Sequence, residues 1–286
     1  MESPSSALPL PLFAAFAGLL GALVGSFLNV VIHRLPRGES VVRPGSRCPA
    51  CGSAIRPWHN VPVLSWLALR GRCRDCGARI SVRYPLVEAG TAALFVLIAL
   101  RFGPTPATAL WMAFGAALLA AALIDADHRI IPDELSLGGL AVGLTLMPAA
   151  QVLEGASAPD AWRHALAGAA LGGGLLWIVG FVHARVCAAA GRRFDHWPGE
   201  GEDFPRPGSL DWWTWFPGMG FGDVKLLAMI GAFVGPVGVV HTIVAASLLG
   251  LVFGIAWAAL RRGLGVPFGF GPMLALGALL AILVPL

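Results

Sequence analysis

The sequence predicts an all-α membrane protein with about eight transmembrane helices. Of its 286 residues, 57% are hydrophobic and only 13% are charged, and the mean hydropathy is +0.75. A chain of this composition has too little polar surface for an ordinary soluble domain. Its 37 glycines suit close helix packing in a bilayer, where small residues let two backbones approach each other.

Eight apolar stretches are the candidates for crossing about 30 Å of hydrocarbon, which takes roughly 17 to 25 residues. They run approximately over residues 8–32, 85–100, 107–124, 135–150, 165–182, 224–240, 241–260 and 266–286. Only a Gly-Pro-Val-Gly segment separates the sixth from the seventh. The first stretch has no basic residue before it and is longer than a signal-peptide core, so we expect it to remain as a helix.

The basic residues predict which ends of the helices face the cytosol. Cytosolic loops collect Lys and Arg, and 18 of the 20 fall in four alternate segments of the chain. These segments are 33–84, 125–134, 183–225 and 261–265. The N-terminus and the C-terminus are therefore predicted to lie outside. The net charge is +4, but the basic residues are sorted by membrane side. We therefore expect membrane lipids as partners and no nucleic acid.

The predicted domain organisation follows from these segments. Residues 1–32 form a first transmembrane helix, residues 33–84 a cytosolic module, and residues 85–286 a membrane domain. The membrane domain carries an extended cytosolic loop at about 183–222.

The cytosolic module contains two C-x-x-C pairs, and each pair is followed by glycine. The cysteines are Cys48, Cys51, Cys73 and Cys76. Two thiolates on each of two tight turns make a tetrahedral S4 site, which predicts a zinc-ribbon-like module with structural zinc. Two disulfides are the alternative, but a reducing cytosol favours the metal. The arginines of the module could contact acidic headgroups or a negatively charged peptide, or could simply be solvated.

The third apolar stretch ends in a cluster of carboxylates. Asp125, Asp127 and Asp133 lie within nine residues, and carboxylates beside a membrane span are costly unless they are solvated or functional. Asp125 is the predicted functional residue. For Asp127 and Asp133, a role in the site and a place at a loop end are equally good interpretations.

The second carboxylate site opens the sixth stretch, where Asp223 follows the alternating glycines Gly218, Gly220 and Gly222. Such glycines let a backbone pass close to another group. A dinucleotide-binding loop is excluded, because the spacing differs and no strand precedes it. The predicted topology puts Asp125 and Asp223 on the same side of the membrane. Two close aspartates can share a proton, so that one activates a water as base and the other protonates the leaving amine as acid.

Other nucleophiles fit less well. The sequence has no Gly-x-Ser-x-Gly and no His-Glu-x-x-His motif. His183 and Cys187 are four residues apart on one helix face, where packing at the helix end is the better interpretation. His164 and His241 are interpreted as interface residues.

Five segments together resemble the prepilin leader peptidases, which are membrane aspartyl peptidases and N-methyltransferases of type IV pilus and type II secretion systems. The segments are GSFLNVVIHRLP at 25–36, the two C-x-x-C pairs, RYPLVE at 83–88, IDADHRIIPD at 124–133 and GMGFGDVK at 218–225.

The resemblance implies a bacterial inner-membrane enzyme that cleaves the basic leader of a type IV prepilin or pseudopilin after glycine on the cytosolic side. By motif, the catalytic pair falls on Asp125 and Asp223. The family also methylates the new N-terminal residue with S-adenosylmethionine. The cysteine module and the segment 83–88 are where that second activity is expected, although no residue pattern marks the binding pocket.

One segment differs from the family pattern. Residues 192–217 look longer than the usual connection before the glycine motif, and they carry Trp197, Trp212, Trp213 and Trp215. An aromatic patch at the headgroup level is favoured over a cap on the site.

Two rival functions use the same features. An ion or proton-coupled transporter also needs membrane carboxylates, but it predicts them in mid-span. A non-enzymatic membrane assembly subunit would explain the cysteines and leave the two aspartates without a role.

Overall fold

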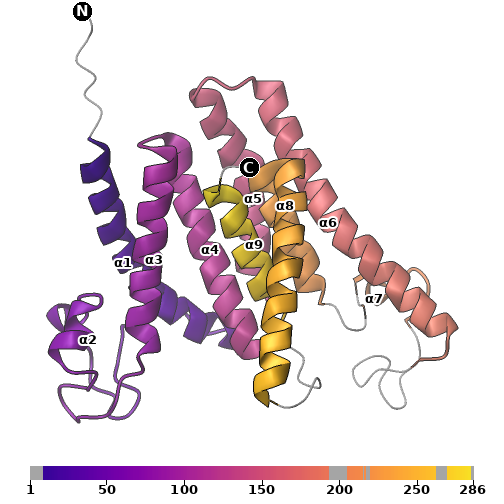
Figure 1. Cartoon of the computed structure of the whole chain (residues 1–286). Helices are drawn as coiled ribbons and strands as arrows, with labels where there is room; N and C mark the ends of the chain where they lie inside the picture. Colours follow the sequence, from indigo (N-terminus) through magenta and orange to yellow (C-terminus); the bar gives the residue numbers. More distant parts are fainter. Residues whose placement is uncertain (1–8, 193–204, 215, 217–219, 262–268, 285–286) are drawn as a thin grey trace, which may run out of the picture. The chain divides into compact units, whose positions relative to one another are not determined.

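A computed structural model describes residues 9–192, 205–214, 216, 220–261 and 269–284 (Figure 1). Within these ranges the chain is helical and contains no named strand. The long helices are α1 (Leu10–Arg34), α3 (Arg83–Phe102), α4 (Pro106–His128), α5 (Asp133–Leu153), α6 (Ala158–Ala189), α8 (Phe221–Arg261) and α9 (Gly271–Leu283). Two short helices, α2 (Leu64–Ala68) and α7 (Leu210–Thr214), lie between them. The predicted all-α membrane class is confirmed.

Six helices of the described part are long and apolar enough to cross a membrane: α1, α3, α4, α5, α6 and α8. Helix α9 is apolar but has only 13 residues. Helix α8 joins the sixth and seventh predicted spans, and it is interrupted at Gly235, where φ is 70°. This left-handed backbone suits glycine, and Pro236 follows it. The count of eight spans stays a prediction.

Helix α6 runs further than the sequence predicts. The fifth span was expected to end at residue 182, but the helix continues to Ala189. Residues 183–189 contain neither glycine nor proline, and the first break is Gly191, with φ of 65°. The start of the predicted cytosolic loop is therefore helical. Its residues 193–204, 215 and 217–219 lie outside the described residues.

The chain divides into two compact units, Met1–Ile124 and Asp125–Leu286. In the first unit, α1 packs on α3 through glycines: a Cβ added at Gly25 would lie 2.7 Å from the Cα of Glu88. In the second unit, α6 packs on α8 in the same manner, and a Cβ at Gly173 would lie 3.0 Å from the Cβ of Ala228. Small residues thus bring these helices together, as expected in a bilayer. The sequence-based division into residues 1–32, 33–84 and 85–286 stays a prediction.

Candidate active site and metal centre

Asp125 lies in the last turn of α4 and is buried, with 6% of its surface exposed. The backbone N–H of Arg129 donates to the carbonyl oxygen of Asp125 over 2.8 Å, and Arg129 itself has a left-handed φ of 57°. Helix α4 therefore ends immediately after this carboxylate. Asp127 is exposed at the same helix end.

The N-terminus of α9 holds the Asp125 carboxylate. The backbone N–H of Gly271 donates to Asp125 Oδ2 over 3.1 Å. A Cβ at Gly271 would lie 2.7 Å from the same oxygen, and a Cβ at Gly269 would overlap it. A helix N-terminus offers free N–H groups and a partial positive charge to an anion. The two glycines therefore allow a backbone approach that no other residue permits.

The sequence reasoning missed Gly269 and Gly271, because both were placed inside the last predicted span. A signal was present in the alternating glycines of the segment GFGP at 269–272, which resembles the alternation before Asp223. What the sequence lacked was any indication that this segment returns to the end of α4, 146 residues earlier.

Asp223 is the third residue of α8 and is also buried, with 9% of its surface exposed. Its N–H donates to the carbonyl oxygen of Gly220 over 3.1 Å, which fixes the entry into the helix. The first part of the glycine motif, Gly218 and Met219, lies outside the described residues.

The second unit brings the two aspartates together. Ile131 connects their surroundings: a Cβ at Gly222 would lie 3.1 Å from Ile131 Cβ, and a Cβ at Gly271 would lie 3.2 Å from Ile131 Cδ1. The start of α8, the start of α9 and the end of α4 thus meet around two buried carboxylates.

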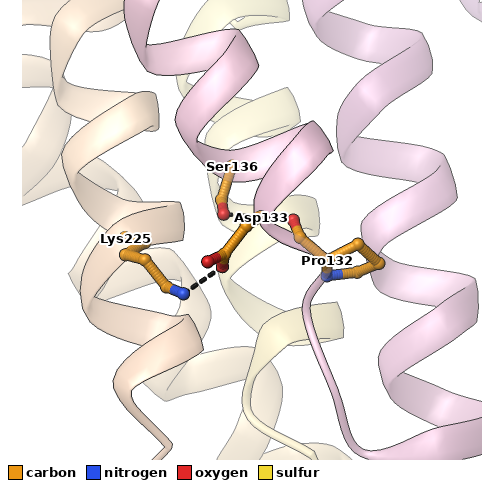
Figure 2. A network of polar contacts seen from close by, with 4 residues as sticks. All are labelled: Pro132, Asp133, Ser136 and Lys225. Atoms are coloured by element: carbon orange, nitrogen blue, oxygen red, sulfur yellow. Dashed lines mark hydrogen bonds and ion pairs between the residues drawn. The ribbon is translucent and has the colours of Figure 1, made fainter. Parts of the chain in front are cut away.

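Asp133 has a different surrounding from the two buried aspartates. It opens α5 and forms an ion pair with Lys225 of α8, as Figure 2 shows. On the same turn of α5, the Ser136 hydroxyl donates to the Pro132 carbonyl over 3.1 Å. The Asp133 side chain is largely exposed, so the structure favours a role at the helix junction over a role in the chemistry.

Asp133→Asn is therefore expected to reduce the peptidase activity that the sequence resemblance implies by less than about tenfold, because an exposed ion pair contributes only about 0–1 kcal/mol. The initial rate of cleavage of a prepilin-like peptide by the purified variant checks this. A loss as large as that of a buried-aspartate variant would instead place Asp133 in the chemistry.

The Trp-rich segment packs partly on α6. The ring of Trp213 stacks on Phe181 with centroids 5.4 Å apart and on Trp177 with centroids 6.0 Å apart. The guanidinium carbon of Arg185 lies 3.4 Å from the centre of the Trp212 ring. These contacts hold α7 on α6. Trp197 and Trp215 lie outside the described residues, so the interfacial patch stays a prediction.

His183 and Cys187 lie on α6 as the spacing predicts. The Cys187 sulfur is 3.4 Å from His183 Nε2, and Cys187 is buried. Both residues lie near the end of α6, which is consistent with packing near the helix end.

The four cysteines of the first unit form a separate cluster. The sulfur atoms of Cys48, Cys51, Cys73 and Cys76 all lie within 4.8 Å of one another, and all four are free thiols, which favours a metal site over the disulfide alternative. In a tetrahedral zinc site with Zn–S of about 2.3 Å, the sulfurs are about 3.8 Å apart. The distance between the Cys48 and Cys76 sulfurs is 3.8 Å.

Two matching backbone turns build this cluster. In the first turn, the N–H of Gly52 donates to the Cys48 carbonyl over 2.8 Å, and in the second the N–H of Gly77 donates to the Cys73 carbonyl over 2.9 Å. Both glycines have a φ of 72°, which explains why glycine follows each C-x-x-C pair. The four residues fit a structural zinc ion, and because all four positions are cysteine sulfurs, such a site has no open position for water.

The thiols of the cluster differ in acidity. Hydrogen bonds from the side chain and backbone of Ser53 lower the pKa of Cys51 to about 6, and a backbone hydrogen bond from Cys76 lowers the pKa of Cys73. A backbone hydrogen bond from Ala78 lowers the pKa of Cys76, but interactions with the neighbouring thiols outweigh it and raise that pKa to about 12. A metal binds thiolates, and the lowered pKa of Cys51 and Cys73 favours the thiolate form at these two positions.

Cys73→Ser is expected to reduce bound zinc from one ion per chain to less than about a tenth, because a structural site of this kind needs all four ligands. Elemental analysis of the purified protein measures this, together with the melting temperature in detergent, which should fall. Cys187→Ser is the matched control, since that cysteine lies outside the cluster. Unchanged zinc content in Cys73→Ser would contradict the S4 site.

Two family models match the chain. One, described as the type IV leader peptidase family, matches residues 112–255, and the other, described as the bacterial peptidase A24 N-terminal domain, matches residues 19–102. The first match includes Asp125 and Asp223, and the second includes the cysteine cluster.

Several curated proteins named prepilin leader peptidase/N-methyltransferase are similar along most of their length. The protein of Pseudomonas aeruginosa is 38% identical over 289 residues, which cover 93% of this chain and 88% of that protein. The protein of Pseudomonas putida is 36% identical over 294 residues, covering 95% and 90%. The protein of Myxococcus xanthus is 41% identical over 246 residues, but the match spans only 63% of that relative. No solved structure matches the chain.

Proposed function

Because the chain belongs to the type IV leader peptidase family, we propose that it cleaves the basic leader of type IV prepilins or type II secretion pseudopilins after a glycine. The observation that supports this best is the meeting of two buried carboxylates, Asp125 and Asp223, where α4, α8 and α9 come together. We assign the catalytic pair to these two residues.

In the proposed reaction, one carboxylate is ionised and the other is protonated. The ionised carboxylate removes a proton from a water molecule, whose oxygen attacks the carbonyl carbon of the scissile peptide. The protonated carboxylate gives its proton to the leaving nitrogen as the C–N bond breaks, and the first carboxylate then carries the proton taken from water. Each turnover thus consumes one water and exchanges the roles of the two groups.

The glycines of α9 give Asp125 a defined place in this pair. The Gly271 N–H donates a hydrogen bond to Asp125 Oδ2 over 3.1 Å, and this bond orients the carboxylate. The proton for the leaving nitrogen still comes from the protonated carboxylate of the pair. Burial excludes water from most of the pair, which strengthens electrostatic interactions inside it.

The positions of the aspartates favour a peptidase over a transporter. Asp125 is in the last turn of α4, and Asp223 is in the first turn of α8. A carboxylate on an ion path is expected in the middle of a span, whereas a peptidase must meet a substrate segment at the membrane boundary. We place this multi-pass protein in the bacterial inner membrane, with the N-terminus outside and the two aspartates toward the cytosol.

We propose a second activity because the similar proteins are named prepilin leader peptidase/N-methyltransferase. The chain would methylate the new N-terminal amine, with S-adenosylmethionine as the methyl donor. The four cysteines would hold a structural zinc ion, which stabilises the module and takes no part in peptide cleavage.

Cleavage of a prepilin-like peptide by the wild-type protein in liposomes tests the proposal, with labelled S-adenosylmethionine present. The expected result is release of the leader after its last glycine and labelling of the shortened peptide. Addition of precleaved peptide measures methylation separately from cleavage. If the wild-type protein cleaves no substrate of this class, the proposed function is wrong.

A further inference from the structure

Helix α2 of the cysteine module turns its apolar side outward. Leu64 and Leu67, three residues apart and therefore on one face, are 64% and 58% exposed. The opposite face points into the module, where Trp66 Nε1 donates to the Ile80 carbonyl over 3.1 Å and the Ser65 hydroxyl donates to the Trp58 carbonyl over 3.3 Å. This arrangement is the reverse of that of an ordinary surface helix.

Two more large apolar side chains extend the exposed surface. Trp58 and Val61 precede α2 and are exposed as well. Together with Leu64 and Leu67 they form what we call the α2 patch. These four large apolar side chains lie within ten residues and outside the candidate membrane-spanning helices. Apolar residues grouped in this way indicate a binding surface, whereas single scattered ones do not.

A hydrogen bond joins the residue before α2 to α3. The backbone N–H of Val63 donates to Glu88 Oε2 over 2.7 Å, and Glu88 is buried at the sixth position of α3. At 1.5 Å per residue, this position lies about 7.5 Å into the helix. Figure 1 shows α2 beside the end at which α3 begins. The first turn of α2 therefore lies beside the first turns of α3, a helix long and apolar enough to cross a membrane.

The backbone at this contact is strained. Val63 has a φ of 61° and a ψ of −51°, a conformation that is unfavourable for a β-branched residue. Strain of this kind persists only where the surroundings hold it. Here the Val63 N–H donates to the buried Glu88 carboxylate, which ties the start of α2 to α3.

The charge of the module complements an anionic membrane surface. Residues 33–84 contain ten arginines and only two acidic residues, Glu39 and Asp75. Arg56 and Arg70, which flank the α2 patch in sequence, are both exposed. Basic residues near a membrane surface are attracted by anionic lipids, and an apolar face between basic residues is typical of a segment that lies in the interface.

We propose that the α2 patch inserts into the headgroup and acyl boundary of an anionic phospholipid leaflet, so that the cysteine module lies on the membrane beside α3. This inference does not depend on the peptidase activity. It assigns a lipid-binding surface to residues that neither the aspartate pair nor the cysteine cluster uses.

Photo-crosslinking of the full chain in nanodiscs tests the proposal. Leu67→benzoylphenylalanine is prepared in nanodiscs that contain equal amounts of phosphatidylglycerol and phosphatidylcholine, and the adducts are identified by mass spectrometry. The matched control places the same group at Asp75, which is exposed in the second cysteine turn. We expect severalfold more lipid adducts at position 67 than at position 75, with phosphatidylglycerol enriched over phosphatidylcholine.

Three results would overturn the proposal. Adducts at position 67 with another protein chain or with an added prepilin-like peptide would make the α2 patch a protein-binding surface. Equal lipid labelling at positions 67 and 75 would remove the specific role of the patch. Equal labelling of the two lipids would remove the anionic preference. If the Leu67 variant does not fold, Trp58→benzoylphenylalanine replaces one exposed aromatic group with another and gives the same measurement.

Discussion

Asp125→Asn and Asp223→Asn are each expected to reduce prepilin cleavage by about 10³- to 10⁴-fold, the largest loss expected of any substitution in this chain. An amide keeps the shape of the carboxyl group, but it can neither remove a proton from water nor carry a proton to the leaving nitrogen. Both residues are buried, so bulk water cannot easily take over their roles. The double variant should be hardly worse than either single variant, because the two groups act as one unit.

The measurement is the initial rate of leader release by purified variants in liposomes. Asp127→Asn serves as the control, since it removes a carboxylate two residues from Asp125 at an exposed position. Melting temperature in detergent and zinc content show whether each variant is folded. Near-normal cleavage by Asp125→Asn or by Asp223→Asn would exclude that residue from the catalytic pair.

Gly271→Ala is expected to lower kcat about 100-fold and to leave KM nearly unchanged. The new Cβ would lie 2.7 Å from Asp125 Oδ2, which is closer than such atoms can approach, so the carboxylate must move. A displacement of about 1 Å at a reacting group can cost about 100-fold in rate. Alanine is a better helix former than glycine, so the start of α9 should not be destabilised by the backbone change itself.

Steady-state cleavage kinetics separate this effect from misfolding or weaker substrate binding. Gly174→Ala is the matched control, because a Cβ at Gly174 of α6 would meet no other group within 4 Å. A rise in KM with unchanged kcat would show that Gly271 affects substrate binding and not the position of Asp125. Normal kinetics would show that the contact between α9 and Asp125 has no role in catalysis.

Local patterns in the sequence were sufficient for several features. The apolar stretches predicted the membrane class, because a lipid environment tolerates few structures other than helices. The doubled C-x-x-C-G predicted a four-cysteine cluster, because each turn is built from adjacent residues and its glycine supplies the left-handed φ. Asp125 and Asp223 were recognisable as candidates, because carboxylates at the ends of apolar stretches are uncommon.

Other features depend on contacts between distant residues. The Gly-Pro-Val-Gly segment marked the place where α8 is interrupted at Gly235, but the sequence did not mark the end of α6, which depends on where helices pack. The sequence left the roles of Asp127 and Asp133 open, and the exposure of both residues and the ion pair of Asp133 with Lys225 set them apart from the buried Asp125.

The sequence by itself determined the membrane class, the cysteine turns and the identity of the candidate aspartates, because each of these depends on neighbouring residues. Only the tertiary structure decided that Gly269 and Gly271 of a distant segment enclose Asp125, and that α2 is bound to Glu88 with its apolar face outward. Such contacts join residues 25 to 146 positions apart, and no local periodicity or spacing specifies which of many similar glycines or carboxylates will meet.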